Sequence, residues 1–197
     1  GFMLNLVAGL SGIIFSLPIG ILLALGRRSK LPAVRLLSVT FIEFIRGVPL
    51  ITLLFVAIII LQLFLPPNVS VDQLVRVMIM ITLFASAYMA EVFRGGLQSI
   101  PIGQFEASRA IGMSYWKMMG YIILPQAIRN SIPALMNTCI MIFKETTIVM
   151  LIGFSDLLGI IQLSLESSDW VGPPHIFSSA YVFAALIYFS FTFGMSK

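Results

Sequence analysis

Five apolar stretches dominate the sequence, and each approaches or meets the roughly 20 residues with which an α-helix crosses the hydrocarbon core of a bilayer. They run from Phe2 to Leu25, Phe41 to Leu65, Leu74 to Val92, Ile132 to Gly153, and Phe177 to Phe193. Hydrophobic residues make up 59% of the 197 residues and charged residues only 10%, against roughly a quarter charged in soluble domains. The sequence therefore predicts an all-α fold, a polytopic transmembrane helix bundle with about five spans that forms a single domain over residues 1–197.

The loops between these stretches differ in charge, and the difference predicts their side of the membrane. The first and third loops are basic, and their cations are Arg27, Arg28, Lys30, Arg35, Arg94, Arg109, Lys117 and Arg129. The second and fourth loops carry mainly acidic residues, namely Asp72, Asp156, Glu166 and Asp169. Because basic loops stay in the cytoplasm, we expect the start of the chain outside and Lys197 inside.

The composition excludes several classes of function. The formal charge of +4 comes from basic residues scattered between apolar runs, so no continuous face for binding nucleic acid is predicted. Cys139 and His175 are the only cysteine and histidine, so we expect no metal site. The sequence also lacks a nucleotide-binding phosphate loop, a His-Glu-x-x-His motif and a Gly-x-Ser-x-Gly motif. We therefore expect no catalytic residues.

The third loop, residues 94–129, is too polar to span the membrane and too apolar for an idle linker. Its pattern predicts a short helix from Gln104 to Ile111, a turn at Gly112 and a second helix from Tyr115 to Ile123. Pro125 is expected to end or kink that second helix. Periodicity leaves two interpretations open, an amphipathic helix pair at the lipid headgroups or a docking element for a cytoplasmic partner.

Within this loop, a Glu-Ala-Ser triplet is followed at fixed spacing by a glycine and by Ile-x-Leu-Pro. The residues are Glu106, Ala107, Ser108, Gly112, Ile122, Leu124 and Pro125. This pattern resembles the EAA motif of ABC importer permeases, with Ser108 in place of the second alanine. Residues 43–50, 90–96 and 144–147 resemble the polar amino-acid uptake branch of that family, with Val48 where the branch has threonine. The resemblance covers nearly the whole chain.

The resemblance implies a permease subunit of an ATP-binding-cassette importer for polar or general L-amino acids in the bacterial inner membrane. It also implies a second permease subunit, identical or homologous, together with two cytoplasmic ATPase subunits and a periplasmic amino-acid-binding protein. The seven matching loop residues are then the ATPase-coupling residues, and 94–129 is the cytoplasmic coupling loop. The permease itself is expected to be non-catalytic and to bind no cofactor, since ATP and Mg are used by the partner ATPase.

The amino acid that is transported stays open. Residues 171–175 and 193–197 resemble the general L-amino-acid permeases, whose corresponding subunit carries extra N-terminal sequence. Glutamate/aspartate and glutamine permeases are the alternatives. The chain starts at Gly1 and ends at Lys197, each directly beside an apolar run, so we expect it to be a fragment of a longer protein.

Six charged or polar residues inside the apolar stretches are candidates for the substrate pathway, namely Glu43, Arg46, Lys144, Glu145, Thr146 and Thr147. A charge in hydrocarbon costs at least about 2.5–3.5 kcal/mol on insertion scales, so each charged candidate needs a function or a partner. Glu43 and Arg46 lie three residues apart on one helical face and can pair, whereas the adjacent Lys144 and Glu145 need partners on another helix. A corridor with both signs of charge suits an amino-acid zwitterion. Interhelical salt bridges that only hold the bundle together are the alternative.

Three further expectations concern packing and ion pairs. Glu91 and Arg94 are interpreted as an ion pair at the membrane border, with a gating role as the alternative. Asp156 is expected to cap a helix or to line the outer mouth. No two glycines lie four residues apart, so close helix packing must use other small residues.

The alternative function is a secondary transporter or channel that works without ATP. Internal inverted repeats are typical of that class. Five spans do not divide into two equal halves, and the EAA-like loop has no role in such a protein.

Overall fold

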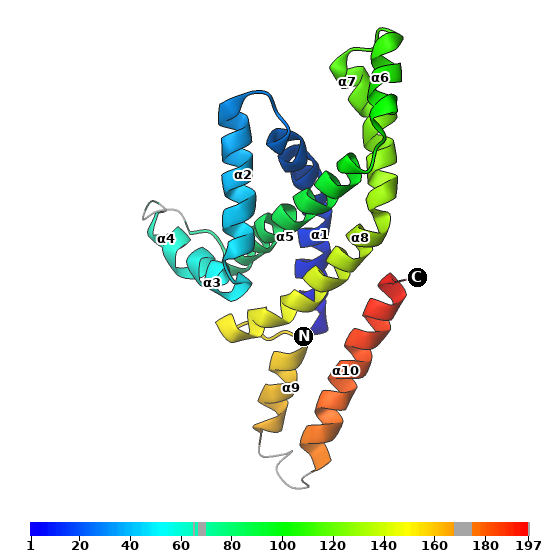
Figure 1. Ribbon diagram of the computed structural model, residues 1–197. Helices are drawn as coiled ribbons and strands as arrows, with labels where there is room; N and C mark the ends of the chain where they lie inside the picture. The colour runs from blue at the N-terminus through cyan, green and yellow to red at the C-terminus, as the bar shows by residue number, and fades with distance from the viewer. Residues whose placement is uncertain (65, 67–69, 168–174, 197) are drawn as a thin grey trace.

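The computed structural model describes residues 1–64, 66, 70–167 and 175–196, and within these residues all regular structure is helical. In chain order the elements are α1 (Phe2–Arg27), α2 (Pro32–Gly47), α3 (Leu50–Phe55), the π-helix η1 (Val56–Ile60), α4 (Leu61–Leu63), α5 (Gln73–Gln98), α6 (Ile102–Ala110), α7 (Tyr115–Met118), the π-helix η2 (Met119–Ile123), α8 (Leu124–Glu145), the 3-10 helix η3 (Thr146–Ile152), α9 (Leu157–Leu165) and α10 (His175–Met195). Figure 1 shows α1, α5 and α8 crossing at the centre, with α6 and α7 at one end of the molecule and α9 and α10 at the other. The predicted all-α bundle is confirmed.

Four helices in the described residues are long and apolar enough to cross a membrane, namely Phe2–Arg27, Gln73–Gln98, Tyr115–Ile152 and Ile176–Met195. A fifth span is reached if α2 and the bent continuation Leu50–Leu63 are counted together. The predicted first, third and fifth spans are thus helices, and each helix extends beyond its predicted apolar run. The extension is expected because a helix continues into polar residues once it leaves the hydrocarbon.

The predicted second span, Phe41 to Leu65, is wrong as a single straight helix. The axis turns by 107° between α2 and α3. Pro49 is the physical reason, because the residue before a proline avoids the helical conformation, and Val48 is extended with φ −105° and ψ 134°. Pro49 also supplies no backbone N–H to continue the helix. Leu65 itself lies outside the described residues.

The predicted fourth span, Ile132 to Gly153, covers only the second half of a longer helix. One continuous helix runs from Tyr115 to Ile152. Pro125 was expected to end or kink the preceding helix, and the first alternative is wrong because the helix continues past it. A π-helical turn ends two residues before the proline, at Ile123, and the Leu124 N–H that follows it donates to the Met119 carbonyl. A π-turn spaces the hydrogen bonds five residues apart, which lets the chain pass a residue that has no N–H.

Small residues let α1 and α5 pack closely at the centre of the fold. The buried face of α1 carries Gly12, Ser16 and Gly20 at four-residue spacing. A Cβ atom at Gly12 would lie 2.8 Å from the Ile81 side chain, and one at Gly20 would lie 2.6 Å from Met89 Cβ. Both distances are too short for a larger residue, so the close packing uses two glycines eight residues apart, with Ser16 between them, in place of a glycine pair four residues apart.

Candidate functional site

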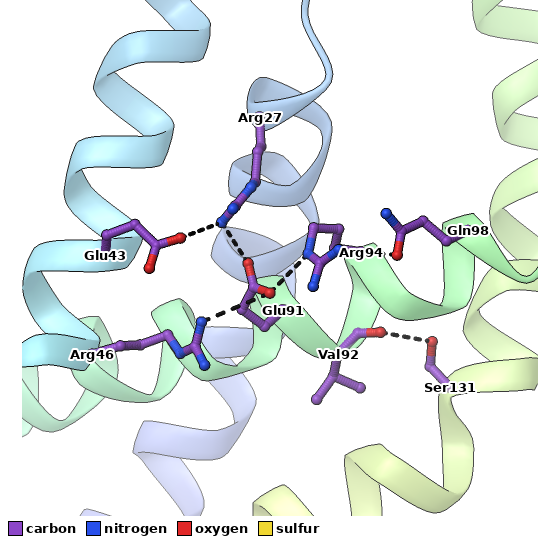
Figure 2. Close-up of polar contacts among 8 residues, drawn as sticks. All are labelled: Arg27, Glu43, Arg46, Glu91, Val92, Arg94, Gln98 and Ser131. Atoms are coloured by element: carbon purple, nitrogen blue, oxygen red, sulfur yellow. Dashed lines mark hydrogen bonds and ion pairs between the residues drawn. The ribbon is translucent and has the colours of Figure 1, made fainter.

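An ion-pair network joins α1, α2 and α5 around the carboxylate of Glu91 (Figure 2). Glu91 Oε1 lies 2.6 Å from Arg27 Nη1. Glu91 Oε2 lies 2.7 Å from Arg94 Nε and 3.7 Å from Arg46 Nη1. Arg27 Nη1 also lies 2.8 Å from Glu43 Oε1. The network therefore ties the last residue of α1 to both neighbouring helices.

The network confirms one predicted ion pair and corrects another. Glu91 and Arg94 pair as predicted. Glu43 and Arg46 do not pair with each other, because α2 packs against α1 and α5 and brings Arg27 and Glu91 within reach of them. Sequence reasoning missed Arg27 and the central role of Glu91, since partners 64 residues apart leave no local signal.

Arg46 is the most loosely held cation of this network. Three guanidinium groups and two carboxylates leave one positive charge unbalanced. The 3.7 Å contact of Arg46 with Glu91 is longer than a hydrogen bond. The Arg46 guanidinium carbon also lies 5.5 Å from the centre of the Tyr88 ring, which is a cation–π distance. Arg46 is therefore the cation best able to bind a further anion.

Arg46 and Glu145 line the same pocket, which has a volume of about 340 Å³ and lies where the break between α2 and α3 faces α5 and α8. The lining residues are Arg46, Gly47, Val48, Pro49, Leu50, Phe84, Tyr88, Met141 and Glu145. No ion pair joins Glu145 to another residue in the described ranges. The pocket thus offers one cation and one anion to a ligand, and it brings together two of the six predicted pathway residues.

The other four predicted pathway residues lie outside this pocket. The Glu43 side chain is 54% exposed in its pair with Arg27. Lys144 is exposed on α8. The Thr147 hydroxyl donates to the backbone carbonyl of Lys144 over 2.9 Å. Thr146 is buried and belongs to a separate cluster.

That separate cluster joins α1, η3 and α9 through buried polar groups. Asn5 Nδ2 donates to Thr146 Oγ1 and to Asp156 Oδ2, both over 3.2 Å. Asp156 Oδ1 accepts from the Gly159 N–H over 2.7 Å, so Asp156 caps the start of α9, which is one of the two roles expected for it. Because all three side chains are buried, their hydrogen bonds fix how these segments meet.

The predicted coupling loop forms a hairpin of α6 and the start of the long α7–α8 helix (Figure 1). Gly112 makes the turn with φ of +77°, a left-handed conformation that favours glycine. Glu106 and Ala107 are exposed, whereas Ser108 is buried and its hydroxyl donates to the Gln104 carbonyl over 2.6 Å. Ile122 and Leu124 are half-buried at the base of the hairpin, and Pro125 is exposed there.

The tip of this hairpin carries exposed aromatic residues. Tyr115 is 52% exposed and Trp116 is 75% exposed, and their rings meet edge to face at 5.2 Å. Arg28 from the end of α1 lies over the Phe105 ring at 5.8 Å, which ties α6 back to the bundle. The hairpin thus has a fixed base and an exposed tip.

Known proteins resemble this chain over most or all of its length. Residues 16–196 match the family described as binding-protein-dependent transport system inner membrane component. The chain is 50% identical over its whole length to the inner membrane amino-acid ABC transporter permease protein YhdY of Escherichia coli, and 50% identical to the glutamate/glutamine/aspartate/asparagine transport system permease protein BztC of Rhodobacter capsulatus. It covers 53% and 45% of these two proteins and so spans about half their length. The probable amino-acid permease protein YxeN of Bacillus subtilis is 33% identical over 96% of this chain and 82% of that protein.

Solved structures share the fold. The crystal structure of an amino acid ABC transporter with histidines matches with a TM-score of 0.84 and 31% identity, over 100% of this chain and 87% of that one. The MetNI methionine ABC transporter in an inward-facing conformation matches with a TM-score of 0.70 over 98% of this chain and 88% of that one, and at 21% identity it supports the fold alone. The predicted resemblance is confirmed, and the chain belongs to the family of binding-protein-dependent transport system inner membrane components.

Proposed function

We propose that this chain is the membrane-spanning permease subunit of an ATP-binding-cassette importer that moves L-amino acids across the bacterial inner membrane. The family match and the 50% identical relatives, both named as permeases, support the class of transporter. The observation that carries the proposal is that Arg46 and Glu145 line one pocket among the membrane helices. An amino acid presents a carboxylate and an ammonium group, and this pocket offers a counter-charge for each.

In the proposed complex, the substrate carboxylate binds the guanidinium of Arg46, and the substrate ammonium group binds Glu145. A guanidinium suits this role because its planar fork can hold both oxygens of a carboxylate. Binding also balances the positive charge that the Glu91 network leaves unpaired. Phe84, Tyr88 and Met141 supply the apolar walls against which the substrate side chain lies.

The coupling loop, residues 94–129, is proposed to receive the ATPase. Glu106 and Ala107 are exposed on α6, and the neighbouring hairpin tip exposes Trp116, so this end combines charge with apolar surface for a protein partner. ATP and Mg act on that partner, and this chain only transmits the movement. Two ATPase subunits, a second permease subunit and a periplasmic amino-acid-binding protein complete the proposed importer.

The proposed orientation places the coupling loop in the cytoplasm, the start of the chain outside and its end inside. The basic loops 26–31 and 94–129 support this orientation. The name of the Rhodobacter relative supports small polar amino acids such as glutamate and glutamine as the first substrates to test.

The test is amino-acid uptake by proteoliposomes that contain the full-length permease with its second permease and ATPase subunits. With the binding protein outside, uptake of labelled L-glutamate or L-glutamine is expected only when ATP is enclosed with the ATPase. Uptake that follows an ion gradient without ATP would contradict the proposal and favour a secondary transporter.

A further inference from the structure

A second pocket lies beside the Arg46–Glu145 pocket on the same pair of helices. It has a volume of about 460 Å³ and is lined by Glu91, Val92, Gly95, Gly96, Ser99, Asn130, Ser131 and Ala134. On α5, Tyr88 of the first pocket and Glu91, Gly95 and Ser99 of the second follow at spacings of three and four residues, which places them on one face. The second pocket therefore lies further along α5 and includes the first residues of the coupling loop.

Both pockets are also lined by α8, where the residues of the second pocket come earlier in the chain than those of the first. Glu145 and Met141 line the first pocket, and Ala134 and Asn130 line the second. Met141 and Ala134 are seven residues apart, which is two helical turns and again one face. Both pockets thus lie along one side of the α5–α8 pair, and the second pocket reaches the C-terminal end of α5.

The second pocket is open and polar at the end near the loop. Apart from the adjacent residues and the backbone of its own helical turns, no heavy atom in the described part of the chain lies within 4 Å of a Cβ placed on Gly95. Asn130 Nδ2 donates to Ser99 Oγ over 2.9 Å, and both residues are exposed. Exposed polar groups next to a membrane are stable where they meet water or protein rather than lipid, so this surface suits a wet passage at the coupling-loop end of α5.

The boundary between the two pockets is the contact of Arg46 with Glu91 (Figure 2). Arg46 lines the first pocket and Glu91 lines the second. This 3.7 Å contact is the longest in the network, and Glu91 also pairs with Arg27 and Arg94 at 2.6 and 2.7 Å. The contact can therefore open without leaving Glu91 unpaired.

We propose that the pocket at Gly95, Ser99 and Asn130 is the exit site through which the amino acid leaves the Arg46–Glu145 pocket for the cytoplasm, with the Arg46–Glu91 contact closing the boundary between them. This inference rests on the proposed function. A carboxylate bound to Arg46 competes with Glu91 for the same guanidinium, so an arriving substrate itself weakens the boundary. The small residues of the exit site leave room for a side chain to pass.

The test is Gly95→Leu in the full-length permease, assembled with its partner subunits. A Cβ at Gly95 meets open space, and a leucine side chain built from it would occupy the exit site that Gly95 lines. Equilibrium binding of labelled L-glutamate and L-glutamine is expected to stay within about twofold of the unchanged complex, while ATP-driven uptake falls at least about tenfold, because only a step after binding is blocked. Gly194→Leu on α10 is the matched control, since its Cβ also meets no described atom, and it should leave both measurements unchanged.

Normal uptake by an assembled Gly95→Leu complex would overturn the exit site. Loss of the second permease from the complex, seen by size-exclusion chromatography, would also overturn it, because Gly95 would then lie in a subunit interface. Failure of the proposed function looks different, since the unchanged complex would then show no ATP-driven uptake.

A second measurement does not depend on a bulky side chain. Gly95→Cys, in a background where the buried Cys139 is replaced by alanine, should react with a membrane-impermeant thiol reagent added to the cytoplasmic face of inside-out vesicles. Absence of labelling in the assembled complex would contradict a water-filled exit site.

Discussion

Arg27 and Glu91 lie 64 residues apart in the sequence and form an ion pair of 2.6 Å between Arg27 Nη1 and Glu91 Oε1. The pair joins the last residue of α1 to the C-terminal part of α5. The Glu91 side chain is 16% exposed and serves three arginines. Glu91 is therefore the common acceptor that holds the ends of three helices together.

Glu91→Gln is expected to destabilise the protein more than Glu43→Gln does. A neutral amide cannot balance the arginines around Glu91, and leaving partly buried charged partners unsatisfied costs on the order of 1–3 kcal/mol. The half-exposed pair of Glu43 with Arg27 is worth only about 0.2–1 kcal/mol. The measurement is the thermal unfolding midpoint of the full-length permease in detergent, and equal shifts for the two variants would contradict the central role of Glu91.

Gly96→Ala is expected to lower stability, whereas Gly95→Ala should not. A Cβ at Gly96 would collide with Ser131 Oγ and with the Ala127 backbone carbonyl, and backbone cannot move aside cheaply. A Cβ at Gly95 meets open space, and alanine in a helix is better than glycine by roughly 0.5–1 kcal/mol. Thermal unfolding of the two single variants checks this contrast, and it fails if Gly96→Ala is as stable as the unchanged protein.

Glu106→Lys is expected to abolish binding of the ATPase while leaving the permease in the membrane. Glu106 is exposed on α6, so the reversal acts on a partner rather than on packing. Glu166→Lys is the matched control, since Glu166 is also exposed but follows α9 at the opposite end of the molecule (Figure 1). The measurement is the amount of ATPase that co-purifies with each variant. An unchanged amount of ATPase with Glu106→Lys would contradict docking at this helix.

Asn5→Leu is expected to destabilise the junction of α1, η3 and α9 by roughly 1–3 kcal/mol, because Asp156 and Thr146 both lose the buried donor that Asn5 supplies. Asn137→Leu is the comparison, since Asn137 is exposed on α8. The unfolding midpoints should separate clearly. Similar midpoints would show that the buried amide adds little.

The helices and several local features were predictable from the sequence because their causes are local. Apolar runs of membrane length located three spans, the glycine at position 112 located the hairpin turn, and the spacing of Glu91 and Arg94 located their ion pair. Asp156 was expected as a cap or as part of the outer mouth, and it caps α9.

The pocket could not be predicted because it arises where distant segments meet. Pro49 was visible in the sequence, but apolar residues on both sides hid the 107° turn within one hydropathic run. That turn brings the backbone around Val48 against α5 and α8. Thr146 was grouped with Glu145 because they are adjacent, yet the two side chains lie on different sides of the helix, one with Asn5 and the other in the pocket.

The most direct measurement is equilibrium binding of labelled L-glutamate and L-glutamine to the purified transporter complex without its binding protein, for Arg46→Gln and Glu145→Gln. Each variant removes one charge that contacts the zwitterion, and hydrogen bonds to charged groups are worth about 1.5–3 kcal/mol, so affinity should fall at least about tenfold. Glu43→Gln, which lies outside the pocket, should bind as the unchanged complex does. Unchanged affinity in both Arg46→Gln and Glu145→Gln would show that the amino acid does not bind between these residues.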